Sequence, residues 1–489
     1  EDRHIKLMLA DGLRGAGRLD EARALLGALI ESFGRRRSAQ RAEVHVRLAR
    51  VAQAQGKPEE AIDELEEASK MAPGNVAILR ALAQTAHAAG QLDRAERAYR
   101  TLLLSLRRGS EEATPISPAE IYLELATIAG ERGDDEKAEE LRESILEAVA
   151  EDDGQAPKVQ NALRQRQQFE LLRRVLDTRL AGVKTARRRA RILAELGDVL
   201  ERDLGRPEQA LDARLSAVEA DPSSPVLHEA VKDLAIQLGK TERYQALLEH
   251  RLSLLRRGDE ALVRCELLLR LGEVMASREQ WARAEELLGQ AEETGVRQVD
   301  VWRAQAKVAG AQGNAERQVE LLQRLANLGA DQAETRADAR FRMAEVLLAD
   351  VEAIDEGIGQ LSAAIEDDPR WSRAALILGR ACEQHGDNDA LLDFYERVAR
   401  RSEDPNILLH CLERRANQPD ISLERVREAV ELAIKLDQAD RAEALMLRAV
   451  EISKNLIDGA SQVDWALLAQ QLDTLAPGVS FIPEIWQGH

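Results

Sequence analysis

Small residues recur along this chain at intervals of 34 positions, and this spacing constrains the fold more than any other feature of the sequence. Ala49 and Ala83 are 34 residues apart, and so are Gly56 and Gly90. A fixed interval of this length is typical of stacked supersecondary units, each too small to bury its own apolar surface. The 489 residues are also too many for one compact core, so the sequence predicts a repeat array.

Within one interval, the pattern predicts two antiparallel helices joined by a tight turn. Aromatic residues make up only 3% of the chain, and Ala, Leu, Glu and Arg dominate, which favours helices over strands. Small residues such as Ala61 and Ala68 let two helix backbones approach closely, and Gly56 suits the sharp turn between them. Pro73 is placed to end the second helix. We therefore expect an all-α chain.

These spacings resemble those of the tetratricopeptide repeat family, whose pattern has small residues at repeat positions 8, 20 and 27, a turn near position 15 and proline at 32. The clearest units begin near residues 3, 42, 76 and 119, and others follow over nearly the whole chain. The resemblance implies an α-α superhelical solenoid of about twelve tetratricopeptide-like helical hairpins.

Some units depart from this pattern. The units that end at Pro222 and Pro369 each contain a one-residue insertion, and the unit at 226–258 lacks the small residues. Residues 158–181 contain no glycine or proline but keep a helical stripe of apolar residues. We expect that last segment to be helical without being a standard unit.

The pattern divides the chain into five segments. We expect an N-terminal tetratricopeptide-like array, a degenerate helical joint, a central tetratricopeptide-like array, C-terminal helical hairpins and an apolar tail. In that order, the segments cover residues 1–153, 154–189, 190–401, 402–475 and 476–489. The chain starts at Glu1 without a methionine and is soon in a helical pattern, so we expect a fragment of a longer polypeptide.

No motif of a catalytic, metal or cofactor site is present. The sequence has no G-x-x-x-x-G-K-[ST] phosphate loop, no H-E-x-x-H and no G-x-S-x-G. No two of the eight histidines lie three or four residues apart, and the three cysteines have no metal-ligand spacing. We therefore expect a protein that is not an enzyme and that binds no metal and no cofactor.

Charge and hydropathy narrow the classes of partner. The net charge of −19 argues against a nucleic-acid partner and against an anionic membrane surface. The longest apolar runs, such as 374–379, are too short to span a bilayer, so we expect no direct membrane insertion. The few cysteines weakly favour the cytoplasm over the periplasm without deciding between them.

The resemblance implies a binding groove lined by the first helix of each unit. In the family, repeat positions 2, 5, 9, 12 and 13 face this groove. The candidates carried over to this sequence are polar or charged: Arg50, Gln53, Arg80, Gln84, His87, Arg303 and Lys307. The alternative for each of them is an ordinary solvated helix surface.

The charge of the chain changes sign sharply between two neighbouring segments. Residues 131–153 hold eleven acidic and three basic side chains, whereas residues 158–191 hold eleven basic and two acidic ones. Mutual neutralisation of neighbouring helices would explain this arrangement. The other interpretation is an exposed basic patch that docks an acidic partner, with Arg187, Arg188 and Arg189 as its candidate residues.

These observations predict a non-catalytic protein–protein interaction scaffold, which binds a peptide segment or a helix of a partner protein in the solenoid groove. Two alternatives stay open. The chain is compatible with a structural spacer or self-assembly arm of a larger complex, so self-association is allowed. It is also compatible with the non-catalytic repeat region of a longer enzyme.

Overall fold

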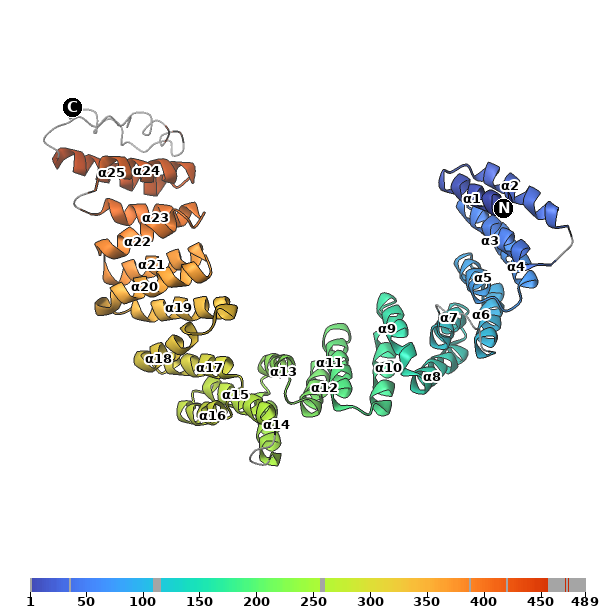
Figure 1. Cartoon of the computed structure of the whole chain (residues 1–489), viewed down its shortest axis with the longest axis horizontal. Helices are drawn as coiled ribbons and strands as arrows, with labels where there is room; N and C mark the ends of the chain where they lie inside the picture. The colour runs from blue at the N-terminus through green and yellow to red at the C-terminus, as the bar shows by residue number, and fades with distance from the viewer. Residues whose placement is uncertain are drawn as a thin grey trace. The chain divides into compact units, whose positions relative to one another are not determined.

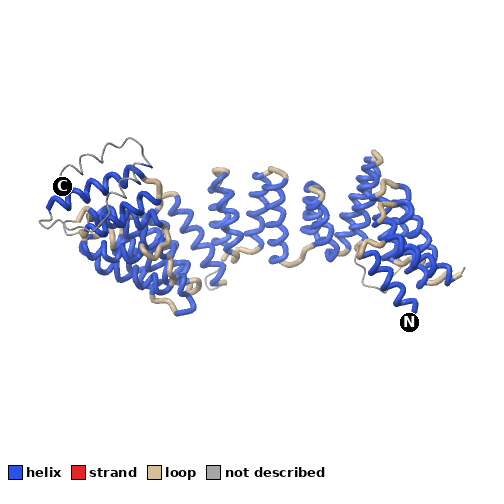
Figure 2. The backbone as a smooth tube through the Cα atoms, turned by 90° about the horizontal axis from the view of Figure 1, so that it is seen from above, coloured by secondary structure: helices blue, strands red, loops and turns tan. Residues whose placement is uncertain are grey.

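The computed structural model describes residues 2–34, 37–108, 116–255, 260–386, 388–418 and 421–455, and the single residues 471 and 474. These residues form 25 α-helices, shown in order in Figure 1, and Figure 2 shows helices and loops but no strand among them. The expected all-α class is confirmed. The predicted apolar tail at 476–489 lies outside the described residues.

The chain divides into two compact units, Glu1–Leu247 and Leu248–His489. The first unit contains α1 (Asp2–Gly15), α2 (Leu19–Phe33), α3 (Ala39–Ala54), α4 (Pro58–Met71), α5 (Val76–Ala88), α6 (Leu92–Arg107), α7 (Pro118–Glu131), α8 (Asp135–Glu151), α9 (Ala156–Gln165), α10 (Phe169–Gly182), α11 (Ala186–Asp198), α12 (Pro207–Ala220) and α13 (Pro225–Gln237). The boundary between the units falls within α14 (Thr241–Leu254).

The second unit continues with α15 (Ala261–Ser277), α16 (Trp281–Glu293), α17 (Gln298–Ala311), α18 (Ala315–Ala326), α19 (Ala333–Leu347), α20 (Ile354–Asp367), α21 (Trp371–His385), α22 (Asp389–Ala399), α23 (Pro405–Ala416), α24 (Leu423–Lys435) and α25 (Ala439–Asn455). In both units the helices follow one another as hairpins, and α23 leads into the hairpin of α24 and α25. The expected solenoid of about twelve helical hairpins is confirmed.

The hairpins α3–α4, α5–α6, α7–α8 and α15–α16 close where the sequence has small residues. Ala61, Ala68, Ala95 and Ala138 are all fully buried, as the repeat pattern predicts. In α15, a Cβ atom added at Gly272 would lie only 2.9 Å from Cγ of the α16 residue Leu288. A larger residue at these positions would therefore push the two helices apart.

The turn inside the hairpin needs one residue with a left-handed backbone. Gly56 has φ 71°, and the following amide, at Lys57, donates a hydrogen bond of 2.9 Å to the carbonyl oxygen of Ala52. This bond ends α3 and reverses the chain into α4. Glycine adopts this conformation without the clash that a Cβ atom would cause.

The segment 154–189 is a hairpin built without the small residues of the repeat. Its turn has the same backbone hydrogen bond, 2.9 Å from the amide of Gln168 to the carbonyl of Leu163, but the left-handed residue is Gln167, with φ 56°. Counted from this turn, repeat positions 8, 20 and 27 are Gln160, Leu172 and Arg179. The sequence predicted helix here but not the hairpin, because none of the marker residues is present.

Arg179 fills the space that alanine fills in other units. Its side chain is 10% exposed, and its Nε lies 2.7 Å from a carboxylate oxygen of Asp153. Burial lowers the pKa of the Arg179 guanidinium, and the charge of Glu195 offsets part of that effect. The pairing with Asp153 compensates for placing a cation between helices.

The one-residue insertion in the unit that ends at Pro222 lies in a π-helical turn, Val199–Asp203, between α11 and α12. A π-helical turn holds one residue more than the α-helical turn that it replaces. In the unit that ends at Pro369, the longer connection between α19 and α20 contains a short 3₁₀ turn, Val351–Ala353. Both insertions therefore lengthen the turn region and leave the hairpin contacts in register.

Ion pairs connect the second helices of successive hairpins in the first unit. Arg94 of α6 lies 2.6 Å from Asp63 and 2.7 Å from Glu66 of α4. Lys137 of α8 lies 2.7 Å from Glu96 of α6. The side chains of these two cations are 25–31% exposed, so each pair contributes about 0–1 kcal/mol. Apolar burial therefore provides most of the stacking energy.

We expect Gln167→Gly to stabilise the α9–α10 hairpin by about 1 kcal/mol. The left-handed conformation costs a residue with a Cβ atom about 1–2 kcal/mol, and glycine avoids this cost. Part of the gain is lost because glycine increases the conformational entropy of the unfolded chain. Hydrogen exchange of the hairpin amides measures this locally, which suits a repeat array that need not unfold as one unit. The control Gln165→Gly, placed in right-handed helix, should instead lower protection. Equal effects from both variants would contradict the turn assignment.

We expect Gly272→Ala to destabilise the α15–α16 hairpin by about 1–3 kcal/mol, because the new methyl group meets Leu288. The matched control is Gly289→Ala in α16 of the same hairpin, where an added Cβ has no atom within 4 Å. That change should stabilise the helix by about 0.5–1 kcal/mol. Opposite shifts in amide protection are expected, and a neutral Gly272→Ala would show that the helices can separate freely.

Candidate protein-binding surfaces

The first helices of the first unit lie side by side and form a continuous polar row. Nε2 of Gln53 in α3 donates a 2.7 Å hydrogen bond to Oγ1 of Thr85 in α5. His87 of α5 has its Nε2 3.0 Å from a carboxylate oxygen of Glu131 in α7. Two of the predicted candidates, Gln53 and His87, therefore each contact the first helix of the next unit.

Glu124 extends this row to α9, and the sequence analysis missed it. Its carboxylate lies 4.0 Å from Nδ1 of His87 and 2.5 Å from the guanidinium of Arg166. Arg166 also donates a 3.0 Å hydrogen bond to Oγ1 of Thr127. Glu124 stands at repeat position 6, outside the positions that the family resemblance marks, and no signal in the single sequence singles it out.

The remaining candidates of α3 and α5 differ in exposure. Arg50 and Gln84 are exposed, and their side chains have no hydrogen bond or ion pair within the part of the chain that the structure describes. Arg80 is half-buried, and its Nε atom is buried without a hydrogen-bond partner among the described residues. A buried donor of this kind has unused hydrogen-bonding capacity.

Burial also fixes the charge state of the residue beneath this row. Tyr99 of α6 is almost fully buried. Burial raises the pKa of its phenol, and the nearby charge of Glu124 raises it further, while Arg166 and Arg80 oppose the rise. Tyr99 is therefore a neutral core residue at physiological pH and does not act as an ionised group of the surface.

Arg303 and Lys307, the candidates of α17, belong to the second unit, so the structure does not bring them into the row of the first. Both are exposed. Arg303 pairs with Asp300 on its own helix, at 3.3 Å. Lys307 has no ion pair within the described residues.

The three candidates of the basic patch stand in the first turn of α11 and are all exposed. They do not share one environment. Arg188 pairs with Asp153, which also pairs with Arg179. Arg187 and Arg189 have no side-chain hydrogen bond or ion pair within the described residues.

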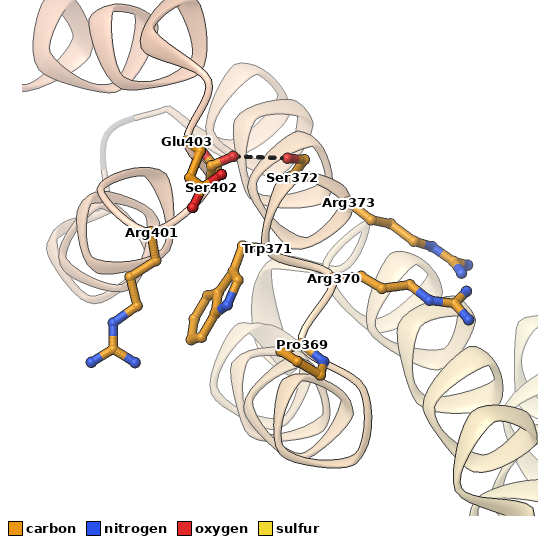
Figure 3. Close-up of a pocket in the computed structure, with 8 residues that line it drawn as sticks. All are labelled: Pro369, Arg370, Trp371, Ser372, Arg373, Arg401, Ser402 and Glu403. Carbon is orange, nitrogen blue, oxygen red and sulfur yellow. Dashed lines mark hydrogen bonds between the residues drawn. The ribbon is translucent and has the colours of Figure 1, made fainter.

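The second unit holds a pocket of about 350 Å³ between the loops that precede α21 and α23 (Figure 3). The hydroxyl of Ser372 donates a 3.1 Å hydrogen bond to the carbonyl oxygen of Ser402 and so joins the two loops. The guanidinium carbon of Arg401 lies 5.0 Å from the centre of the Trp371 ring. The sequence analysis did not identify this pocket, because its lining residues come from two stretches, 369–373 and 401–403, that are distant in the sequence.

Two other arginines that line the pocket, Arg370 and Arg373, form ion pairs with a carboxylate of the protein. Arg370 and Arg373 lie 3.3 Å and 2.5 Å from the carboxylate of Asp338, and Figure 3 shows both pointing away from Trp371. Burial raises the pKa of Asp338, but the hydrogen bond from Arg373 and the surrounding arginine charges outweigh it and leave that pKa below its ordinary value. The positive charges of Arg370 and Arg373 are therefore already compensated by Asp338.

Within the described residues, no group of three or more His, Cys, Asp or Glu side chains is placed to hold a metal ion. The three cysteines, Cys265, Cys382 and Cys411, are buried and form no disulfide. None of the helices among the described residues combines the length and the apolar character that a membrane crossing requires.

Residues 52–112 match the sequence profile of the tetratricopeptide repeat family. A search of curated proteins found no match to the chain. Among solved structures, the chain is similar to a tetratricopeptide repeat protein from Parabacteroides merdae ATCC 43184, with 16% identity, 62% of this chain and 96% of that chain covered, and a TM-score of 0.26.

It is also similar to yeast Tom70, with 12% identity, 97% and 96% of the two chains covered and a TM-score of 0.33. A third similar structure is YrrB, described as a TPR protein with an unusual peptide-binding site, with 21% identity, 41% and 97% coverage and a TM-score of 0.29. These low TM-scores add nothing to the assignment, which depends on the profile match and on the hairpins. Residues 52–112 match the tetratricopeptide repeat family, and helical hairpins continue on both sides of that match, so the chain is a solenoid of tetratricopeptide-like helical hairpins.

Proposed function

We propose that the chain is a non-catalytic scaffold that binds an extended segment of a partner protein along the first helices α3, α5 and α7. The tetratricopeptide fold implies a protein–protein interaction scaffold, and proteins of this family are generally non-catalytic. The binding mode and the face used are our proposal.

The polar row across these helices is the observation that carries the proposal. Contacts such as Gln53–Thr85 and His87–Glu131 join side chains of successive first helices, so the row continues from one hairpin to the next. Beside it, Arg50 and Gln84 are exposed and make no side-chain hydrogen bond within the described residues. An extended peptide has an unpaired backbone, and such a row offers it donors and acceptors at regular intervals.

Arg80 adds a second argument for this face. Its Nε atom is buried, and no described residue accepts a hydrogen bond from it. Leaving a buried donor unpaired costs about 1–3 kcal/mol, so a partner that supplies an acceptor there would recover part of this energy. Glu124 does not supply this acceptor, because its carboxylate already faces Arg166 and His87.

The test is a double variant, Arg50→Glu with Gln84→Glu, compared with a charge-matched control on the second-helix face. Arg97→Glu with Thr101→Glu changes the charge by the same amount on α6, where both residues are exposed. Short peptides selected from a random display library against the full chain serve as probes. We expect the first variant to weaken their binding by about tenfold or more, equivalent to 1.4 kcal/mol, and the control to leave it unchanged.

A photo-crosslinking amino acid in place of Gln53 gives an independent measurement, since it should attach the selected peptides to α3. Equal sensitivity to both double variants, or crosslinks only from second helices, would show that the first-helix face is not the binding site. Light scattering addresses the alternative of a self-assembly arm. A monodisperse monomer at high concentration would argue against that alternative, whereas assembly lost in the first variant alone would assign the face to a second copy of the chain.

A further inference from the structure

Most cations of the segment 158–191 pair with carboxylates, which accounts for much of the charge change seen in the sequence. Arg174 of α10 lies 2.6 Å from Glu139 of α8 and also pairs with Glu143. The other pairs are Arg164–Glu195, Arg166–Glu124, Arg173–Glu170, Arg179–Asp153 and Arg188–Asp153. For these arginines, neutralisation between and within neighbouring helices is the role that the structure gives.

The cations at the start of α11 are different. Lys184, Arg187, Arg189 and Arg191 are all exposed. Within the residues that the structure describes, none of their side chains has a hydrogen bond or an ion pair. Four cations without a described partner therefore lie within eight consecutive residues of a chain whose net charge is −19.

The carboxylates of α10 and α11 already have arginine partners and are not free to neutralise these cations. On α10 and α11, each acidic side chain already pairs with another arginine. These pairs are Glu170–Arg173, Asp177–Arg173, Glu195–Arg164 and Asp198–Arg214. Asp153, just before α9, pairs with both Arg179 and Arg188. The cation cluster therefore differs from its neighbours in lacking an internal partner.

The position of the cluster is also unfavourable for the helix itself. The amino-terminal end of a helix carries partial positive charge, so acidic residues are preferred there and cations are disfavoured. The first turn of α11 contains no acidic residue, and the side chain of its N-cap, Thr185, makes no capping hydrogen bond. Folding of this helix therefore gives no reason for placing Arg187 and Arg189 at this end.

We propose that Lys184, Arg187, Arg189 and Arg191 form a docking surface for an acidic segment of a partner protein. This surface is separate from the row on α3, α5 and α7, and the proposal does not depend on the one made for that row. A short acidic segment complements four cations, whereas a nucleic acid would extend its charge along a chain whose net charge is −19. Arg188 is left out of the surface because it already pairs with Asp153.

The test uses the full chain with Arg187→Gln, Arg189→Gln and Arg191→Gln combined. The probes are a labelled peptide of alternating Glu and Ser, the same peptide with Lys in place of Glu, and a DNA oligonucleotide with as many charges. The control combines Arg18→Gln, Arg142→Gln and Arg283→Gln, which removes three arginines whose side chains are 39–59% exposed and each pair with a glutamate one turn away. We expect the first triple variant to weaken binding of the Glu peptide by about tenfold and the control to leave it unchanged.

The melting temperature separates docking from a structural role. Because the three cations have no internal partner and oppose the helix dipole, we expect the first triple variant to melt at the same temperature or slightly higher. A lower melting temperature would overturn the proposal. The proposal would also be overturned if the Glu peptide did not bind, or if it bound the triple variant as well as the original chain. It would be overturned too if the DNA bound more tightly than the Glu peptide and the triple variant abolished that DNA binding. Self-association that only this variant abolishes would assign the cluster to a second copy of the chain instead.

Discussion

The close contact between the two helices of each hairpin is the constraint on which the rest of the structure depends. Ala49 and Ala61 are both almost completely buried where α3 meets α4, and at Gly272, where α15 meets α16, Leu288 leaves no room for a Cβ atom. A hairpin closed in this way presents an apolar surface that it cannot bury alone. The next hairpin covers that surface, and in α3–α7 the result is one continuous core that includes Tyr99. The same stacking aligns the first helices, so that residues such as Gln53 and His87 become neighbours of the following unit.

The sequence was sufficient wherever the small residues themselves make the contact. Ala61 and Gly56 are recognisable because nothing larger fits the contact and little else suits the turn. The sequence was insufficient where a larger residue takes the place of a small one and a neighbouring side chain offsets the cost of burying it. In α9–α10, Arg179 replaces alanine because Asp153 neutralises it. In α13–α14, His228 and Tyr244 are both fully buried and joined by a 2.8 Å hydrogen bond, a pair that a search for small residues does not detect.

For the candidate binding surfaces, too, the sequence predicted some of the residues and missed others. Repeat position predicted which residues lie on the first helices, because position along a hairpin determines the face of the helix. It did not predict Glu124, since that side chain reaches the row from position 6 to meet Arg166 and His87. Counting charges was also insufficient. The sequence treats Arg174 and Arg187 alike, whereas the structure pairs Arg174 with two glutamates of α8 and leaves Arg187 without a partner among the described residues.

Ion pairs between hairpins therefore do more to organise the surface than to stabilise the stack. At an exposure of about one quarter to one third, each pair is worth about 0–1 kcal/mol, which is small beside the burial of a single leucine at about 2 kcal/mol. Their effect on binding is larger, because a paired cation must lose its carboxylate before it can bind another. An acidic segment that binds Arg174 has to displace Glu139 and Glu143. One that binds at the start of α11 breaks no pair, because Arg187 and Arg191 have none to lose among the described residues.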